Sequence, residues 1–196
     1  VIKYIMSSET TQAECLAIYQ TSEPYVKNFR TAIDIGCRDG DFTIPLSKNF
    51  KSVKAFDYRK RSNLIKRLPA NTEFFKFAIG DKIDTVKSYG GVILDQQGNR
   101  KKPTVLVKQK TLDSFNFSNV DYIKIDVEGH ELKVLKGATN TIKKYNPLIV
   151  IEENGSAVLW KKGKSNEAID YLLRLNYKIV DKWKNDYIME SDALRG

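Results

Sequence analysis

The alternation of short apolar runs with segments of helical spacing is the feature that most restricts how this sequence can fold. The runs are bounded by glycine, proline or charged residues, which predicts short buried strands. Strands that alternate with helices are typical of a parallel sheet covered by helices on both faces. The predicted strands are 31–35, 53–56, 74–79, 122–127 and 147–152, and the predicted helices are 41–49, 59–67, 131–145 and 166–175.

Three regions depart from this alternation. Residues 8–29 have helical spacing, and Pro24 is predicted to divide them into two helical pieces. In 85–110, apolar and polar residues alternate around several glycines, which predicts an antiparallel hairpin or flap inserted in the sheet order. Residues 177–181 and 186–189 resemble two final strands joined by a turn, and such a pair commonly adds an antiparallel edge to a parallel sheet.

The composition is that of one globular domain. The chain has 196 residues, 41% hydrophobic and 29% charged, with no internal repeat and no proline- or serine-rich linker. We therefore expect a single domain over 1–196, with a helical extension at 1–30 and an α/β core at 31–196. No apolar run approaches the roughly 20 residues of a membrane helix, and no secretory signal is visible. Cys15 and Cys37 fit neither a disulfide framework nor a zinc site, so a cytoplasmic protein is expected.

The net charge favours anionic partners only weakly. Thirty-three basic and 24 acidic residues give 33 − 24 = +9, which attracts nucleic acid, anionic lipid and phosphorylated molecules. Abundant lysine, asparagine, isoleucine and tyrosine indicate a compositional bias, which we favour as the explanation. The basic clusters at 59–61, 66–67 and 99–102 are more typical of solvated surfaces than of binding sites.

The strongest local signal is the segment 32–40, in which a buried strand ends in a Gly-x-x-x-Gly turn. Glycines allow a tight turn and a close approach to a ligand, and open α/β sheets bind ligands at this end of their strands. Arg38 rules out the dinucleotide fingerprint, and the segment lacks the Gly-Lys-Ser/Thr of a phosphate-binding loop. Asp34 would repel a phosphate but attract an ammonium or sulfonium group. A plain capped turn is the alternative.

A second acidic residue, Asp57, ends the next strand 23 residues after Asp34. An acid about 20 residues beyond such a turn commonly holds a ribose diol. Together the two motifs resemble the class I S-adenosylmethionine-dependent methyltransferases, although Arg38 fills a position that this family often keeps small. The resemblance implies that S-adenosylmethionine is the cofactor, bound at its amino acid end near Asp34, at its ribose near Asp57 and at its adenine near Ala78. The full cofactor set is Asp34, Gly36, Arg38, Gly40, Asp57, Tyr58, Ala78, Ile79 and Asp126.

A third motif narrows the resemblance. Residues 121–131 read Asp-Tyr-Ile-Lys-Ile-Asp-Val-Glu-Gly-His-Glu, and they are followed by Leu-Lys-Gly-Ala at 135–138. With 110–113 and 147–152, these segments resemble the FkbM-type methyltransferases across about residues 31–153. The resemblance implies a Rossmann-like class I methyltransferase sandwich, with a mostly parallel seven-stranded sheet, an antiparallel C-terminal edge strand and an inserted hairpin. It also implies methyl transfer to an oxygen, expected to be a sugar hydroxyl of a glycan or small molecule.

The residues of this third motif offer a catalytic group. Strand alternation puts Lys124 and Asp126 on one face, with Glu128 and His130 just past the strand end. Transfer to a hydroxyl requires removal of one proton, and His130 is the natural titrating group near neutral pH. We expect His130, Asp126, Glu128 and Glu152 to be catalytic. No metal is expected, but the same four residues are an alternative magnesium or manganese site, and a purely structural hydrogen bond is the alternative for His130.

Two other function classes remain open. A nucleic-acid methyltransferase acting on RNA ribose or cap would suit the net charge of +9. The usual ribose enzyme, however, spreads a Lys-Asp-Lys-Glu tetrad over several elements, whereas Lys124 and Asp126 share one strand. A non-catalytic binding module on the same fold is the other alternative. Trp160 and Trp183 are candidates for sugar stacking, although packing is the more common role, and the 99–102 loop is a candidate for binding an acidic glycan, a nucleotide sugar or RNA.

Overall fold

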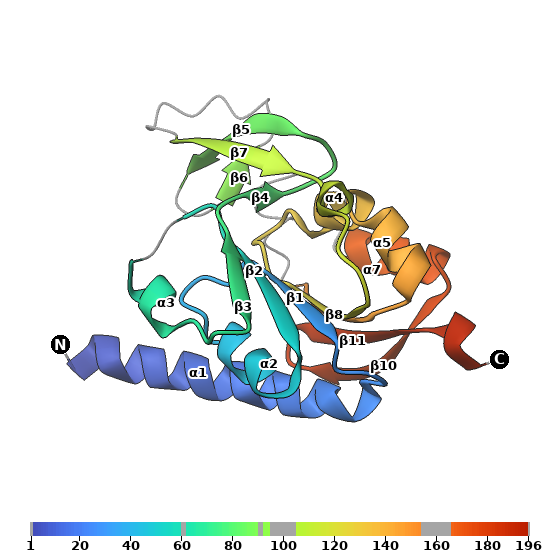
Figure 1. Ribbon diagram of the computed structural model, residues 1–196, viewed down its shortest axis with the longest axis horizontal. Helices are drawn as coiled ribbons and strands as arrows, with labels where there is room; N and C mark the ends of the chain where they lie inside the picture. Colours follow the sequence, from blue (N-terminus) through green and yellow to red (C-terminus); the bar gives the residue numbers. More distant parts are fainter. Residues whose placement is uncertain (1, 60–61, 90–91, 95–104, 154–165, 196) are drawn as a thin grey trace.

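Seven strands form the central sheet of the computed structural model, which describes residues 2–59, 62–89, 92–94, 105–153 and 166–195 (Figure 1). The strand order is β10-β11-β9-β8-β1-β2-β3. Neighbouring strands from β9 to β3 pair in parallel, whereas β11 is antiparallel to both β9 and β10. This confirms the expected mostly parallel sheet with an antiparallel C-terminal edge. The bounds are β1 (Thr31–Ile35), β2 (Ser52–Phe56), β3 (Thr72–Phe75), β8 (Val120–Ile125), β9 (Leu148–Glu152), β10 (Tyr177–Trp183) and β11 (Asp186–Ser191).

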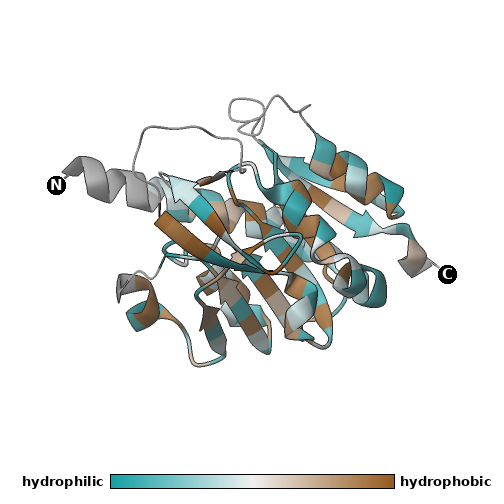
Figure 2. Ribbon diagram, turned by 90° about the horizontal axis from the view of Figure 1, so that it is seen from above, coloured by the Kyte–Doolittle hydropathy of each residue, from teal (hydrophilic) through white to brown (hydrophobic). Residues whose placement is uncertain are grey.

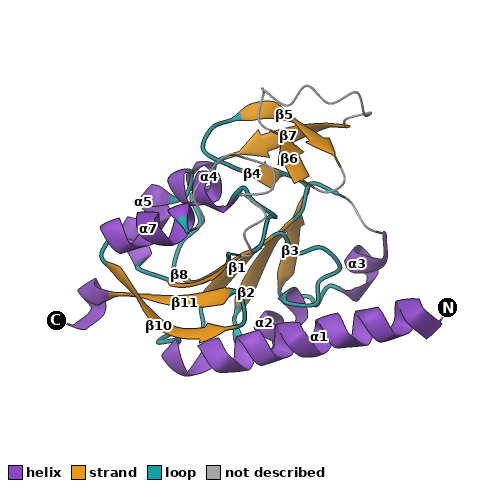
Figure 3. Cartoon of the chain, turned by 180° about the vertical axis from the view of Figure 1, so that it is seen from behind, coloured by secondary structure: helices purple, strands orange, loops and turns teal. Residues whose placement is uncertain are grey.

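Helices cover both faces of this sheet (Figures 1 and 3). One face carries α1 (Ile2–Ser22), α2 (Thr43–Asn49) and α3 (Ser62–Arg67), and the other carries α4 (Glu131–Lys136), α5 (Thr139–Tyr145) and α7 (Glu167–Arg174). Three short 3-10 turns, Glu23–Tyr25, Leu112–Phe115 and Asp192–Arg195, lie at the connections. None of the helices in the described part of the chain combines the length and the apolar character that crossing a bilayer requires.

Strand alternation explains why both faces are buried. Ala32 and Tyr122 point toward α1 and α2, while their neighbours Ile33 and Ile123 pack against α4, α5 and α7. Figure 2 shows the resulting hydrophobic stretches along the central strands. Because a strand covered on both faces needs apolar residues at every position, these segments read as continuous apolar runs.

The flap forms a sheet of its own, which corrects the expectation that it is inserted in the order of the main sheet. The small sheet has the order β4-β7-β5-β6, with antiparallel pairing of β5 to both β6 and β7. The predicted strand 74–79 is also divided between the two sheets. The chain turns after Phe75, whose carbonyl accepts a 3.0 Å hydrogen bond from Phe77 N–H. The bounds are β4 (Ala78–Ile79), β5 (Asp84–Tyr89), β6 (Val92–Leu94) and β7 (Val105–Lys110).

The predicted helices at 131–145 and 8–29 also need correction. The first is two helices, because the Asp113 carboxylate accepts hydrogen bonds from Asn140 N–H at 3.0 Å and Thr141 N–H at 2.9 Å and so caps a new helix start. Between them Gly137 passes so close to Gly80 that a Cβ on Gly137 would lie 1.9 Å from the Gly80 carbonyl oxygen. At the N-terminus α1 runs to Ser22 and only a 3-10 turn follows, so residues 26–29 are not helical.

Candidate active site

Charged side chains form a row on the α1 face of the sheet, where strands β1, β8, β9 and β11 meet. In register, Asp34 on β1 lies opposite Lys124 on β8, and Glu152 on β9 lies opposite Asp186 on β11. Asp34, Lys124 and Asp186 are all buried. Parallel strands end at the same edge of a sheet, which is the edge where α/β folds bind ligands.

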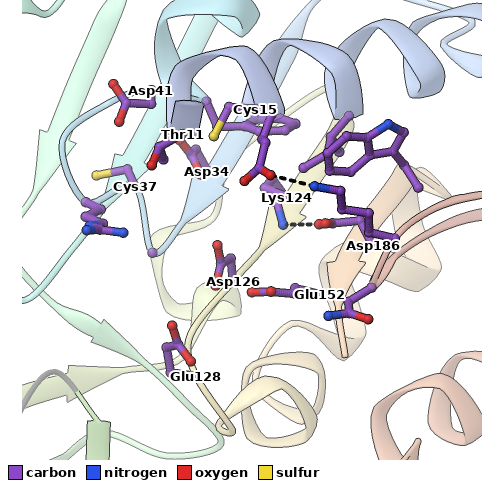
Figure 4. A pocket seen from close by; sticks show the side chains of 18 residues that line it. Thr11, Cys15, Asp34, Cys37, Asp41, Lys124, Asp126, Glu128, Glu152 and Asp186 are labelled. Atoms are coloured by element: carbon purple, nitrogen blue, oxygen red, sulfur yellow. Dashed lines mark hydrogen bonds and ion pairs between the residues drawn. The ribbon is translucent and has the colours of Figure 1, made fainter. Parts of the chain in front are cut away.

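A cavity of about 350 Å³ lies over this row, beneath α1 (Figure 4). This volume falls in the range of about 300–1,000 Å³ typical of small-molecule sites. The cavity lies between α1, the glycine turn after β1, the ends of β8 and β9 and the turn between β10 and β11. Its lining residues are Thr11, Glu14, Cys15, Ile18, Asp34, Gly36, Cys37, Arg38, Asp41, Phe42, Lys124, Asp126, Glu128, Glu152, Trp183, Lys184, Asn185 and Asp186.

The glycine turn contacts the segment that follows β8. Gly36 has φ +93°, and a Cβ built on it would lie 1.8 Å from the Asp126 carbonyl oxygen. Asp126 N–H in turn donates a 3.0 Å hydrogen bond to the Ile35 carbonyl. Only glycine combines this backbone conformation with so close an approach. The predicted cofactor turn and the predicted catalytic segment are therefore in direct contact.

Asp34 is tied to the start of α2. Its carboxylate accepts a 2.5 Å hydrogen bond from the Thr43 hydroxyl. Burial raises the pKa of Asp34 to about 6, while the Thr43 hydrogen bond and the Lys124 charge oppose the rise. At neutral pH Asp34 is therefore an anion, as attraction of an ammonium or sulfonium group requires.

Lys124 and Asp186 form a buried ion pair, with 2.7 Å between Nζ and Oδ1 (Figure 4). Burial alone would lower the pKa of Lys124, but the charges of Asp126 and Asp186 and the hydrogen bond to Asp186 outweigh it and raise that pKa. The lysine is therefore charged inside the fold. Removing either partner of such a pair leaves an uncompensated buried charge.

Asp126 and Glu152 form a carboxyl pair at the centre of the cavity (Figure 4). Burial is the largest cause that raises the pKa of Glu152, followed by a side-chain hydrogen bond to Asp126 and the charge of Asp126. Two close carboxyl groups do not both ionise readily. Burial and the neighbouring Asp126 therefore both favour the protonated form of Glu152.

The structure brings together part of the predicted cofactor set. Asp34, Gly36, Arg38 and Asp126 line the cavity, and Arg38 has an exposed side chain whose Nε lies 3.7 Å from an Asp39 carboxylate oxygen. The remaining members, Gly40, Asp57, Tyr58, Ala78 and Ile79, lie outside the lining of this cavity.

Asp57 directly follows β2, and its carboxylate is hydrogen-bonded to backbone N–H groups. It accepts hydrogen bonds from Arg38 N–H at 3.2 Å and Arg59 N–H at 2.7 Å. Tyr58 hydrogen-bonds through its hydroxyl to Ser88 at 2.8 Å. These contacts join the glycine turn, β2 and the small sheet, to which buried Ala78 and Ile79 also belong.

The predicted catalytic set is divided as well. Asp126, Glu128 and Glu152 line the cavity, but His130 does not. His130 is 3% exposed, and its Nε2 lies 3.1 Å from Oε1 of Gln109 on β7. The chain turns through left-handed conformations at Glu128 (φ +56°) and Gly129 (φ +97°), which directs His130 toward the small sheet. The alternative metal set is likewise not gathered, because the described residues include no group of three or more His, Cys, Asp or Glu side chains placed to hold a metal ion.

Sequence reasoning missed the contributions of α1 and of the turn between β10 and β11. Glu14 and Cys15 line the cavity from α1, and Lys184 and Asp186 line it from the turn, next to Trp183, which the sequence did offer as a candidate for sugar stacking. Burial and the Asp34 charge raise the pKa of the Cys15 thiol to about 12, so it stays protonated. One signal was present: a lysine between Ile123 and Ile125 in a buried strand requires an acidic partner, although the sequence does not say which.

Two sequence candidates, Trp160 and the 99–102 cluster, lie outside the described residues. In the other basic clusters, Arg59 lies 3.5 Å from Asp57 and Arg67 lies 3.6 Å from Asp41. Both arginines thus contact acids of the glycine turn and of the strand beside it.

The strand order, the glycine turn and the acidic cavity together define an α/β methyltransferase fold. The Methyltransferase FkbM domain matches residues 17–179, and the chain belongs to this family. Its similarity to a solved FkbM methyltransferase from Methylobacillus flagellatus covers 83% of this chain and 44% of that one, at 19% identity and a TM-score of 0.55. The N-methyltransferase NodS from Bradyrhizobium japonicum, in complex with S-adenosyl-L-homocysteine, shares the fold at 12% identity and a TM-score of 0.51, over 93% of this chain and 84% of that one.

Two curated proteins are similar in sequence. A hexuronic acid methyltransferase, AglP, from Haloferax volcanii is 30% identical over 107 residues, which cover 52% of this chain and 38% of that protein. A tRNA/tmRNA (uracil-C(5))-methyltransferase from Campylobacter concisus is 27% identical over 165 residues, 83% of this chain and 40% of that protein. The chain therefore spans about two fifths of the length of each.

Proposed function

We propose that this chain binds S-adenosylmethionine and transfers its methyl group to the oxygen of a sugar hydroxyl. The observation that carries the proposal is the contact between the glycine turn and the segment bearing Asp126, which puts a carboxyl pair beside the expected cofactor position. The sequence similarity to a hexuronic acid methyltransferase supports a sugar acceptor.

The residues present fit this cofactor. S-adenosylmethionine carries a sulfonium and an ammonium cation and, when bound, supplies an electrophilic methyl group. Asp34 and Asp126 offer carboxylates to such cations, and the backbone of the turn from Gly36 to Gly40 is available to the amino acid end. Asp57, oriented by two backbone N–H groups, would hold the ribose. Tyr58, Ala78 and Ile79 would lie on the adenine side.

Asp126 is the residue we assign to the proton. The bound cofactor would supply the methyl group, and Asp126 would accept the proton that the acceptor hydroxyl loses on methylation. Glu152, which shares a side-chain hydrogen bond with Asp126, would hold that carboxylate in place. Lys124 interacts favourably with the Asp126 charge. Glu128 and Trp183, which also line the cavity, would contact the sugar.

His130 has a different role in this proposal. It was the candidate base by sequence, but it is buried against Gln109 and does not line the cavity. We assign it to positioning, because its hydrogen bond to Gln109 joins the catalytic segment to β7 of the small sheet.

Calorimetric titration with S-adenosylmethionine and S-adenosylhomocysteine, with NAD as the control, tests the cofactor. Micromolar binding of the first two and none of NAD is expected. Absence of binding by both sulfur compounds would contradict the proposal and favour a binding module of other specificity. Transfer of a labelled methyl group to sugar acceptors then tests the enzyme activity.

A nucleic-acid methyltransferase is the second candidate, because the similarity to the tRNA/tmRNA methyltransferase covers 83% of this chain and the net charge is +9. Incubation of the protein with labelled S-adenosylmethionine and either bulk tRNA or a glycan mixture separates the two. Label in tRNA alone would favour this candidate over the sugar enzyme.

A further inference from the structure

The cavity is acidic although the chain as a whole is basic. Among the residues that the structure describes, seven carboxyl side chains but only three cationic ones line it. The carboxyl groups are Glu14, Asp34, Asp41, Asp126, Glu128, Glu152 and Asp186, and the cations are Arg38, Lys124 and Lys184. The net charge of +9 therefore does not extend to the site where the chemistry is proposed.

Each of these three cations already contacts a carboxylate. Lys124 Nζ lies 2.7 Å from Asp186, Lys184 Nζ lies 2.6 Å from Glu14, and Arg38 Nε lies 3.7 Å from Asp39. Lys184 also lies 4.5 Å from the centre of the Trp183 ring. Figure 4 shows the Lys124–Asp186 pair on the side of the cavity away from Cys37 and Asp41.

These three ion pairs limit the charge that an acceptor can carry into the cavity. The glycine turn and Asp34 form the expected cofactor end, so the end near Glu152, Trp183 and Asp186 is left for the acceptor. An anionic group there would lie among carboxylates, and it would have to break an existing ion pair to gain a cation. A cationic group would instead meet the carboxyl groups of Asp126, Glu152 and Asp186, which line this end of the cavity.

We propose that the acceptor is a sugar without an anionic group beside the reacting hydroxyl, and that amine-bearing sugars bind better than neutral sugars and neutral sugars better than uronates. This specificity rests on the proposed function and deepens it. It would set the chain apart from both curated relatives, whose names specify a hexuronic acid and an RNA. We assign this discrimination to Glu14. Glu14 pairs with Lys184, the more exposed of the two lysines that line the cavity, and so keeps that lysine from binding an anionic acceptor.

Ligand-observed NMR of the protein saturated with S-adenosylhomocysteine tests the order of binding. The probes are the methyl glycosides of glucosamine, glucose and glucuronic acid at equal concentration. Saturation transfer is expected to be strongest for the glucosamine probe and weakest for the glucuronic acid probe. Equal transfer to all three, transfer to none, or the reverse order would overturn the proposal.

Glu14→Gln provides the matched variant. It keeps the shape of the side chain but releases Lys184, so the ratio of glucuronic acid to glucosamine signal should rise by about two- to fivefold, the size expected for a partly exposed charge pair. Glu73→Gln is the control, since Glu73 also holds an exposed lysine pair, with Lys54 at 2.9 Å, but lies on β3 outside the cavity. An equal rise in both variants, or none in Glu14→Gln, would remove the role of Glu14. Cofactor calorimetry does not depend on acceptor charge, so a failure of the proposed function is seen separately.

Discussion

Asp126 is the residue at which cofactor, acceptor and proton meet in the proposed reaction. Asp126→Asn keeps the size of the side chain but removes the proton acceptor. We expect kcat to fall by roughly 10²–10⁴-fold, the usual contribution of a positioned base. The calorimetric Kd for S-adenosylhomocysteine should rise far less, because Asp34 still offers a carboxylate to its ammonium group. Asp192→Asn, at a surface pair with Lys178, is the control. Full turnover in Asp126→Asn would exclude this base.

For His130 we expect only a small effect of substitution on kcat, in contrast to Asp126. If it positions the segment rather than taking the proton, His130→Gln should lower stability and kcat modestly and leave the shape of the pH–activity profile unchanged. The measurement is kcat from pH 5 to 9 in both proteins, with thermal unfolding alongside. Loss of the acidic limb of the profile in the variant would restore His130 as the base.

Asp34 links the site to stability. Its folded pKa of about 6 is above its ordinary value of 3.8, so the folded state holds a proton that the unfolded state has released. Stability therefore decreases as pH rises from about 4 to about 6, by at most about 3 kcal/mol. Asp34→Asn can still accept the Thr43 hydrogen bond but does not titrate.

The unfolding free energy of the unchanged protein should decrease between pH 4 and pH 7, whereas the Asp34→Asn protein lacks this contribution. The difference between the variant and the unchanged protein should therefore shift in favour of the variant by up to about 3 kcal/mol over this range. Urea unfolding at the two pH values measures it. A constant difference between the two proteins would show that Asp34 does not titrate as described.

At the scale of elements, the turn after β1 is the least tolerant connection near the site. In Gly36→Ala the Cβ would meet the Asp126 carbonyl oxygen at 1.8 Å, in addition to the strain of a φ of +93°. The conformation alone costs about 1–2 kcal/mol, and the contact forces backbone apart. We expect lower stability and loss of cofactor binding, measured by urea unfolding and calorimetry.

Gly40→Ala is the matched control for this prediction. Gly40 has a similar φ of +85°, but its Cβ would meet only the end of the Leu64 side chain, at 2.7 Å. The two variants share the conformational strain, so the difference between them measures the backbone contact. Equal losses in both would mean that the contact between Gly36 and Asp126 is unimportant.

The sequence predicts best those helices and strands whose hydrophobic pattern depends only on neighbouring residues in the chain. The central strands are buried on both faces, so each appears as a continuous apolar run. The split at Gly137 was not predictable, because the cap on the second helix comes from Asp113, distant in sequence. The small sheet was recognised by its alternation, but nothing in that alternation specifies pairing with a two-residue strand at Ala78 and Ile79.

The same distinction applies to the site. Asp34, Gly36 and Asp126, which line the cavity, are marked in the sequence by a strand end and a glycine turn. Asp186 and Glu14 were missed because they reach the cavity only through the order of the strands and the path of α1. His130 was placed by its chemistry alone, and the left-handed turn before it decided its direction.

At the scale of the whole molecule, charge is unevenly distributed: +9 overall, but a cavity with more carboxylates than cations. We expect RNA or heparin to bind the outer surface weakly, with an affinity that falls steeply as salt rises. Fluorescence titration with labelled RNA at several salt concentrations measures this. The Kd for S-adenosylhomocysteine should be the same with and without RNA, and competition between them would place the polyanion in the cavity.

The position of β11 has a consequence for the order in which the protein is made. β11 inserts between β9 and β10, and its first residue, Asp186, supplies the counter-charge for Lys124. A nascent chain that has emerged only as far as β9 has every strand that surrounds Lys124 on one side but no carboxylate from β11. Burying an ammonium group without its hydrogen-bonded partner is costly, so we expect the packing around Lys124 to be less stable during synthesis until residue 186 has left the ribosome. The strand that joins β9 to β10 and the partner of Lys124 thus reach the sheet together.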